Sequence, residues 1–198
     1  MPDPLAPLVR ALQRPRPASS DYDLNPDVTL PEGRKLRQAG VLVAIEIEKN
    51  IPQVWLTKRS SALKHHPGQV AFPGGKRDQE DADIAATALR EAKEEIGLPS
   101  TSVTVLGQWS EHETVTRFLI TPVIGVVTKP FVPKPEAGEV EEVFTVPLAH
   151  FLDETRFSVQ SRRWRGQRRY YFSAPYGPYY IWGATARILR SIAEAASV

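Results

Sequence analysis

Apolar positions along the chain follow two spacings, one typical of strands and one typical of helices. Short runs rich in branched and aromatic residues, bounded by Gly, Pro, Asn or Ser, predict strands. These runs span residues 40–47, 53–59, 102–110, 117–127 and 142–148. Two further runs, 156–160 and 168–174, flank a basic turn and predict a hairpin.

Apolar residues three and four apart predict amphipathic helices at 4–14, 148–153 and 183–196. The strongest helical signal is DADIAATALREAKEEIG, residues 81–97, which Asp81 or Asp83 can cap and Gly97 can end. Strands that surround a central and a terminal helix predict an α/β fold with a mixed sheet between helices.

The central helix carries an apolar stripe and a set of glutamates. The stripe consists of Ala85, Ala88, Leu89, Ala92 and Ile96. We expect Glu91, Glu94 and Glu95 to form an acidic ridge on a different face, while the stripe is buried. Like charges at this spacing repel each other, and water, basic neighbours or a bound cation could compensate.

A solvated charged surface is the ordinary interpretation of such a ridge. However, the Gly74–Gly75 turn stands fifteen residues before Arg90, and glycines let a backbone approach a ligand closely. Carboxylates that converge beside backbone carbonyls form the oxygen site that Mg²⁺ or Mn²⁺ prefers, usually together with substrate phosphates. The sequence therefore predicts a metal site here.

Composition limits the alternatives. The chain has 198 residues, 41% of them hydrophobic and 24% charged, and a formal charge of +2, which alone does not argue for nucleic acid or a membrane. The absence of cysteine excludes disulfides, thiolate metal sites and cysteine nucleophiles. No long apolar run suggests a signal peptide or a membrane span, so we expect a cytoplasmic protein by default.

The chain divides into an N-terminal part and one main domain. Residues 15–33 are rich in Pro, Asp and Ser, so residues 1–33 are interpreted as a helix followed by an extended arm. Residues 34–198 form the expected domain. Within it, residues 65–81 contain several glycines and prolines and are expected to form one long loop.

The stretch GGKRDQEDADIAATALREAKEEIGL resembles the signature of the Nudix hydrolases. Its second half, Arg90–Leu98, matches at every position. In the first half Asp81 stands where the signature has Glu, and the interval to Arg90 is one residue longer, which leaves Asp81 as a cap or as a support for the ligands. The resemblance implies the α/β/α sandwich of this family, with a mixed β-sheet between helices.

The resemblance also implies hydrolysis of a nucleoside diphosphate linked to another group. Glu91, Glu94, Glu95 and the carbonyl of Gly74 would hold Mg²⁺ or Mn²⁺, and Arg90 would orient the adjacent glutamate. The general base would be Glu91 or a residue of a later loop. The loop candidates are Glu139 and, as further alternatives, Glu111 and Glu113.

A second stretch, LTKRSSALKHHPGQVAFPGG (residues 56–75), is similar to the motif of the coenzyme A diphosphatase branch. Lys64 stands where that branch has Arg, which keeps the charge but loses a planar bidentate contact. The implied reaction converts coenzyme A and water to 4′-phosphopantetheine and adenosine 3′,5′-bisphosphate. The substrate-binding residues would be Arg59, Lys64, His66 and Gly75, with a structural hydrogen bond as the alternative role of His66.

The branch resemblance implies a small nucleotide substrate and a homodimer, with no nucleic acid or membrane partner. Hydrolysis of another substrate, such as ADP-ribose, and a non-catalytic Nudix-fold binding module are the alternatives. The basic stretch of the hairpin leaves three interpretations open: a solvated tip, a binding site for nucleic acid, or a contact with a dimer partner or with the substrate's 3′-phosphate. Its residues are Arg162, Arg163, Trp164, Arg165, Arg168, Arg169 and Tyr170.

Overall fold

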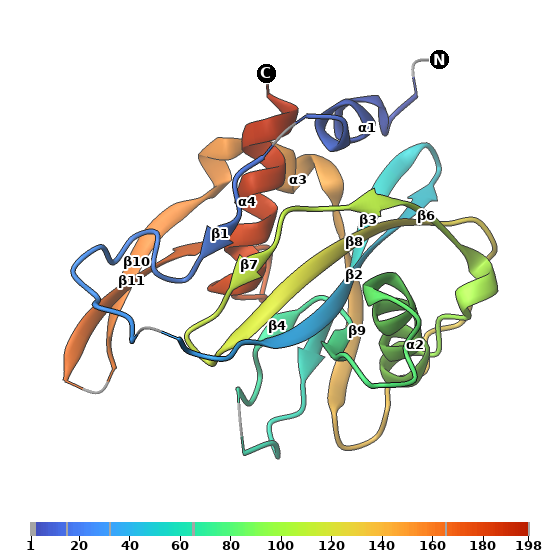
Figure 1. Cartoon of the computed structure of the whole chain (residues 1–198). Coiled ribbons are helices and arrows are strands. Elements are labelled where there is room, and N and C mark those ends of the chain that lie inside the picture. The colour runs from blue at the N-terminus through green and yellow to red at the C-terminus, as the bar shows by residue number, and fades with distance from the viewer. Residues whose placement is uncertain (1–2, 15, 32, 65, 165, 198) are drawn as a thin grey trace.

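The computed structural model describes residues 3–14, 16–31, 33–64, 66–164 and 166–197. Its centre is the long strand β2 (Arg37–Glu48), which pairs in parallel with β8 (Phe118–Val127) and antiparallel with β3 (Ile51–Arg59). Figure 1 shows these strands crossing the middle of the molecule. The predicted mixed sheet is therefore confirmed.

Shorter strands extend this sheet on both sides. β9 (Val140–Pro147) pairs with β3, and β6 (Val103–Gln108) pairs with β8. The remaining members contain two or three residues each: β1 (Ser19–Ser20), β4 (Val70–Ala71), β5 (Gly74–Lys76) and β7 (His112–Glu113). The strands β10 (Ser158–Trp164) and β11 (Gln167–Ser173) form a separate hairpin, as the sequence predicts. The expectation that the basic stretch between residues 160 and 168 is the turn is wrong in part, because residues 161–164 and 167–168 are paired within the strands.

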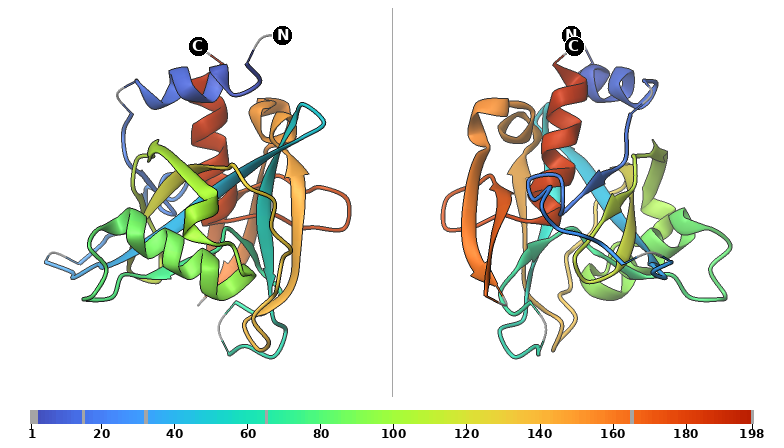
Figure 2. Two further views of the ribbon diagram at one scale, coloured as in Figure 1. Left: turned by 90° about the vertical axis from the view of Figure 1, so that its right-hand side faces the viewer. Right: turned by 60° about the vertical axis from the view of Figure 1, so that its left-hand side comes forward.

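Helices cover both faces of the sheet. α2 (Ile84–Ile96) lies on one face, where Leu42 and Ala44 of β2 pack against Ala88 and Ala92. The next residues of β2, Val43 and Ile45, belong to the core on the opposite face, as the two-residue period of a strand requires. That face is covered by α1 (Ala6–Leu12), α3 (Leu148–Leu152) and α4 (Ala184–Ala196), which Figure 2 shows apart from α2.

Two short 3₁₀ turns, η1 (Ser100–Ser102) and η2 (Glu154–Arg156), complete the elements. The N-terminal helix is part of the main core, because Leu8 and Ala11 are buried in the same cluster as Ile188 and Leu189 of α4. The arm that follows is not wholly extended coil, because β1 pairs in parallel with β7. Within the described residues, no helix combines the length and the apolar character needed to cross a membrane.

The expectation of one long loop over residues 65–81 is wrong in part. This segment contains β4, which pairs with β3, and β5, which pairs with β2. Strands this short carry too little periodicity to be recognised among glycines and prolines. Their formation depends on the edges that β2 and β3 present to them, and it brings the Gly-Gly turn under α2.

Candidate active site

Three local features fix the position of α2. Asp83 caps its first turn, since its carboxylate accepts a hydrogen bond of 2.8 Å from the amide of Ala86. Gly97 ends the helix in the left-handed conformation. Gly40 of β2 allows the helix to lie very close to the sheet, because a Cβ there would stand 2.6 Å from the carbonyl oxygen of Ile84. Of the two caps that the sequence offers, the hydrogen bond to the amide of Ala86 identifies Asp83, and not Asp81, as the cap of α2.

The glycine strand β5 lies directly against the carboxylates of α2. A Cβ on Gly75 would stand 2.5 Å from both Cδ and Oε1 of Glu91. The amide of Gly74 donates a hydrogen bond of 3.1 Å to Oε2 of Glu95. Because real Cβ atoms do not approach other atoms this closely, the position of Gly75 requires glycine while Glu91 keeps this conformation.

Glu95 does not belong to an exposed ridge, contrary to the expectation from the sequence. Only 6% of this residue is exposed. At about 100° per residue, Glu95 falls within about 20° of Ala88 on the helix circumference, so it shares the buried face. Glu91 is half-buried and Glu94 is exposed. The three glutamates therefore run from the interior to the surface.

Burial changes the acidity of the inner glutamates. It raises the pKa of Glu95 to about 7, against the opposing effects of the Gly74 amide and of Arg59. Burial also raises the pKa of Glu91, and the adjacent Arg90 acts in the opposite direction. Glu139 contributes to raising both pKa values, which places its carboxylate within electrostatic range of the pair.

Arg90 connects the helix to the preceding loop. Its Nε and Nη2 donate to the two carboxylate oxygens of Asp81, each at 3.0 Å. Its Nη1 donates to Glu91 at 3.0 Å and to Glu94 at 2.9 Å. The hydrogen bonds from Arg90 hold the pKa of Asp81 well below its usual range. Asp81 thus holds the guanidinium of Arg90 in place. The sequence alone could not decide between this role and that of a helix cap.

Strand β3 and the loop before β9 bring Arg59 and Glu139 to the cluster around Glu91 and Glu95. Arg59, the last residue of β3, lowers the pKa of Glu95 by its charge, and its Nε is buried with no hydrogen-bond partner among the described residues. The loop before β9 is tied to α2, because the amide of Glu136 donates to the carbonyl of Glu95 at 2.9 Å. The amide of Ser60 donates to the carbonyl of Glu139 at 2.8 Å.

Several of these groups fit a hard cation by their chemistry, since they are carboxylate oxygens that lie beside the backbone of Gly74 and Gly75. In the part of the chain described, however, no three Asp, Glu or His side chains form one group that could hold a metal ion. Arg90 forms ion pairs of 3.0 Å with Glu91 and 2.9 Å with Glu94. Nη1 of Arg90 contacts one oxygen of each carboxylate, so a cation could use the second oxygen of Glu91 and of Glu94.

The NUDIX domain family matches residues 36–165, which include every residue of this cluster. The chain is a Nudix hydrolase. It is 40% identical over 157 residues to a protein of Cronobacter sakazakii described as an uncharacterized Nudix hydrolase NudL, a match that covers 79% of this chain and 81% of the relative. A Salmonella heidelberg protein with the same description is 39% identical over 170 residues, or 86% and 88% of the two chains.

Solved structures agree on the fold. The Nudix hydrolase RenU of M. smegmatis superposes with a TM-score of 0.50 at 24% identity, over 59% of this chain and 74% of that one. The family binds small nucleotides and hydrolyses diphosphate bonds, so this Nudix hydrolase acts on a substrate that contains a diphosphate. The identity of that substrate is a separate question.

The remaining predicted residues of this Nudix hydrolase lie outside the cluster. Lys64 and His66 are exposed in the loop that follows Arg59. Glu111 and Glu113 lie at β7, where Glu113 forms an ion pair of 2.6 Å with Arg34. The arginine-rich hairpin extends from the other side of the molecule, as Figure 1 shows, and Arg165 is outside the described residues.

Two residues that help to build the site, Gly40 and Thr87, could not be recognised from the sequence. Gly40 lies in a strand signal, where nothing marks the close approach of α2. Thr87 is buried on the helix and donates from Oγ1 to Asp81 at 2.9 Å, which helps to fix the partner of Arg90. A threonine in a helix is too ordinary to draw notice, and its role follows only from the path of the loop.

Proposed function

We propose that this Nudix hydrolase cleaves the diphosphate of coenzyme A, or of its derivatives, to 4′-phosphopantetheine and adenosine 3′,5′-bisphosphate. One observation supports this most strongly: residues of two sequence motifs, which overlap at Gly74 and Gly75, lie together. Gly75 ends the stretch that resembles the coenzyme A branch and lies against Glu91 of the helix motif. Arg59 lies near the start of that stretch, and its charge acts on Glu95.

The proposed roles follow from the contacts. Glu91, Glu94, Glu95 and the carbonyl of Gly74 would hold Mg²⁺ or Mn²⁺, which supplies charge neutralisation for the diphosphate and lowers the pKa of a bound water. Arg90 keeps Glu91 oriented through the ion pairs that Asp81 anchors.

Arg59 has an unused buried donor beside the cluster and is suited to a phosphate oxygen. Lys64 and His66, exposed in the following loop, are proposed to meet the additional 3′-phosphate, and Gly75 lets the diphosphate approach the backbone. In the reaction, the oxygen of a water bonds to one phosphorus and the bridging oxygen leaves with the other. Glu91 or Glu139 accepts the proton of that water.

The test is incubation of the purified protein with coenzyme A or ADP-ribose, each with Mg²⁺ and with Mn²⁺, followed by chromatography of the products. We expect the two named products from coenzyme A and little turnover of ADP-ribose. The Glu95→Gln variant should lose turnover by about a hundredfold or more, as expected when a group that positions the reaction is removed. Glu80→Gln removes an exposed carboxylate of the preceding loop and should behave as wild type.

Each alternative predicts a different result. Cleavage of ADP-ribose with coenzyme A left intact would place the protein among Nudix hydrolases of other substrates. No turnover of either compound with either metal, in a protein that still binds them, would indicate a non-catalytic nucleotide-binding module.

A further inference from the structure

Arginines are distributed unevenly around the β10–β11 hairpin. Residues 155–193 contain eight arginines and no Asp, Glu or Lys. The arginines at the base of the hairpin have acidic partners: Arg156 pairs with Asp153, Arg187 with Asp23, and Arg190 with Glu154. In the described residues of the hairpin itself, four arginines form no ion pair: Arg162, Arg163, Arg168 and Arg169.

The register of the hairpin arranges these four charges as two cross-strand pairs, one on each face of the hairpin. Arg162 faces Arg169 across the two strands, and Arg163 faces Arg168. Like charges at directly opposite positions destabilise a strand pair. In addition, Nε and Nη1 of Arg169 are buried and have no hydrogen-bond partner among the described residues. An external anion bound by the exposed guanidinium groups would relieve the repulsion.

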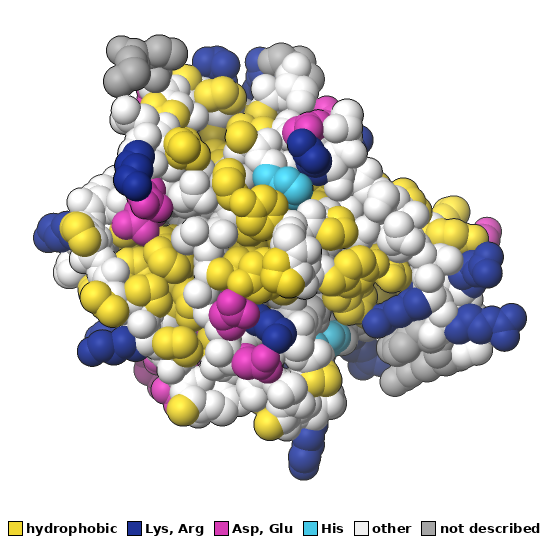
Figure 3. Space-filling model, turned by 180° about the vertical axis from the view of Figure 1, so that it is seen from behind, with side chains coloured by type: hydrophobic (Ala, Val, Ile, Leu, Met, Phe, Trp, Pro, Cys, Tyr) yellow, Lys and Arg dark blue, Asp and Glu magenta, His cyan; other side chains and the backbone are white. Residues whose placement is uncertain are grey.

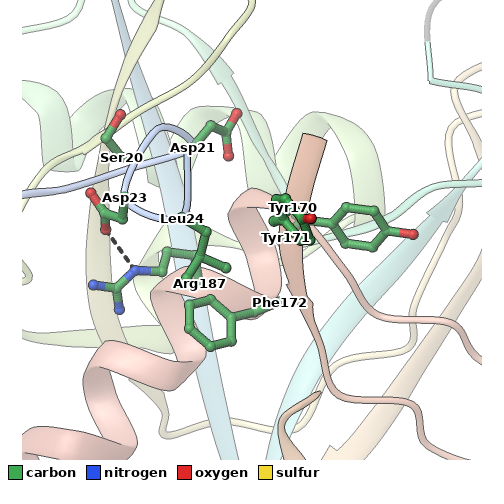
Figure 4. A pocket seen from close by; sticks show the side chains of 9 residues that line it. Ser20, Asp21, Asp23, Leu24, Tyr170, Tyr171, Phe172 and Arg187 are labelled. Carbon is green, nitrogen blue, oxygen red and sulfur yellow. Dashed lines mark hydrogen bonds and ion pairs between the residues drawn. The ribbon is translucent and has the colours of Figure 1, made fainter. Parts of the chain in front are cut away.

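Two acidic residues of the arm, Asp21 and Asp23, form their contacts with residues outside the hairpin. Figure 4 shows a small hollow between the arm and the hairpin, in which Asp23 turns to Arg187 and forms an ion pair of 2.8 Å. Asp21 accepts hydrogen bonds from His112 and from the amide of Val115. These contacts attach the arm to the body and leave the four hairpin arginines without carboxylate partners.

Aromatic rings accompany the arginines. Tyr170 is 42% exposed and Tyr180 is 46% exposed. The guanidinium of Arg162 lies over the ring of Trp182 at 4.2 Å, and the ring of Tyr171 lies 5.1 Å from that of Trp182. Figure 3 shows several Lys and Arg side chains around the end of the molecule where the hairpin projects. Cationic surfaces interleaved with aromatic rings are suited to single strands, whose bases stack on the rings.

We propose that the β10–β11 hairpin binds single-stranded nucleic acid, with arginine–phosphate contacts and base stacking on the exposed tyrosines. The attraction is local, because the whole chain carries a formal charge of only +2. An acidic lipid surface would also meet the charge, but the unpaired donors and the flanking rings are better matched by phosphates and bases on one strand. This inference does not depend on the substrate of the hydrolase.

The experiment measures fluorescence anisotropy of a labelled single-stranded oligonucleotide titrated with the full chain at several salt concentrations. For three phosphate contacts, the slope of log K against log salt is about −2, so affinity should fall by roughly 18-fold between about 50 and 200 mM salt. The Arg163→Gln/Arg168→Gln variant should make this slope shallower by about 1.4. It removes one like-charge pair, so its thermal midpoint should equal or exceed that of wild type.

The matched control is Arg10→Gln/Lys129→Gln, which removes two exposed charges elsewhere and should bind as wild type. Duplex DNA and vesicles with anionic lipid are the competing ligands. Three results would overturn the proposal: no saturable binding of the oligonucleotide at low salt, equal binding by the hairpin variant and the control, or hairpin-dependent binding of duplex or vesicles in preference to the single strand. Hydrolysis is assayed separately and should be unchanged in the hairpin variant.

Discussion

At the scale of single residues, Arg90 shows how the acidic helix tolerates its charges. One guanidinium reaches four carboxylates, those of Asp78, Asp81, Glu91 and Glu94. A basic neighbour therefore compensates part of the repulsion between the glutamates. The bidentate pair with Asp81 is the most buried of these contacts, since only 7% of the Asp81 side chain is exposed, against 57% of Glu94.

Asp81→Asn tests this arrangement. The variant leaves Arg90 without its charged partner, and we expect the free energy of unfolding at pH 7 to fall by about 1–3 kcal/mol, measured by denaturant titration. Asp83→Asn is the matched control, because asparagine caps helices about as well as aspartate. Equal stability of the Asp81 variant and wild type would show that the pair with Arg90 contributes nothing.

The same pair predicts a pH dependence. The folded pKa of Asp81 is depressed, so the carboxylate stabilises the fold above its unfolded pKa of about 3.9. This contribution is lost as the pH falls from there toward the folded pKa. The stability difference between wild type and Asp81→Asn should therefore shrink progressively below about pH 4. A difference that stays constant from pH 7 to pH 3 would contradict this assignment.

At the scale of elements, the site depends on the close approach of β5 and α2. β5 is a strand of three residues whose first two are glycines, and it pairs with β2 at Gly40 and Val41. Gly40 in turn allows α2 to lie on the sheet. Three glycines on two strands thus set the distance between the backbone of β5 and the carboxylates of Glu91 and Glu95.

Gly75→Ala should displace the carboxylate of Glu91, because the added Cβ would stand 2.5 Å from Oε1. We expect kcat/KM for the hydrolysed nucleotide to fall by about a hundredfold, with the circular dichroism spectrum unchanged. In the control Gly107→Ala the Cβ meets its nearest neighbour, Leu12, at 3.5 Å, an ordinary contact, and activity should be retained. Equal activity of the two variants would argue against the close approach.

These elements also show what could be predicted from the sequence. The helix over 84–96 and the β10–β11 hairpin are long and strongly patterned, and both are confirmed. β1, β4 and β5 contain two or three residues, so their existence depends on partners distant in the chain. Glu95 was placed on the wrong face, although its position in the helix puts it close to Ala88.

At the scale of the whole molecule, the site is assembled from distant parts of the chain. β3 supplies Arg59, β5 the glycines, α2 the glutamates and the loop before β9 Glu139. Spacing in the sequence could suggest each group, but not that β3 and that loop meet through the amide of Ser60 and the carbonyl of Glu139. The expected homodimer and the cytoplasmic location stay predictions.

The proposed activity requires the carboxylates of α2 to bind a divalent cation beside the backbone of Gly74 and Gly75. The most direct test of this requirement is the binding of Mn²⁺, followed by the loss of the electron paramagnetic resonance signal of the free ion. We expect saturable binding by wild type and by Glu80→Gln, and an affinity lower by about tenfold or more in Glu95→Gln. Equal affinity in all three proteins, or no binding by wild type at Mn²⁺ concentrations that support hydrolysis, would contradict the account.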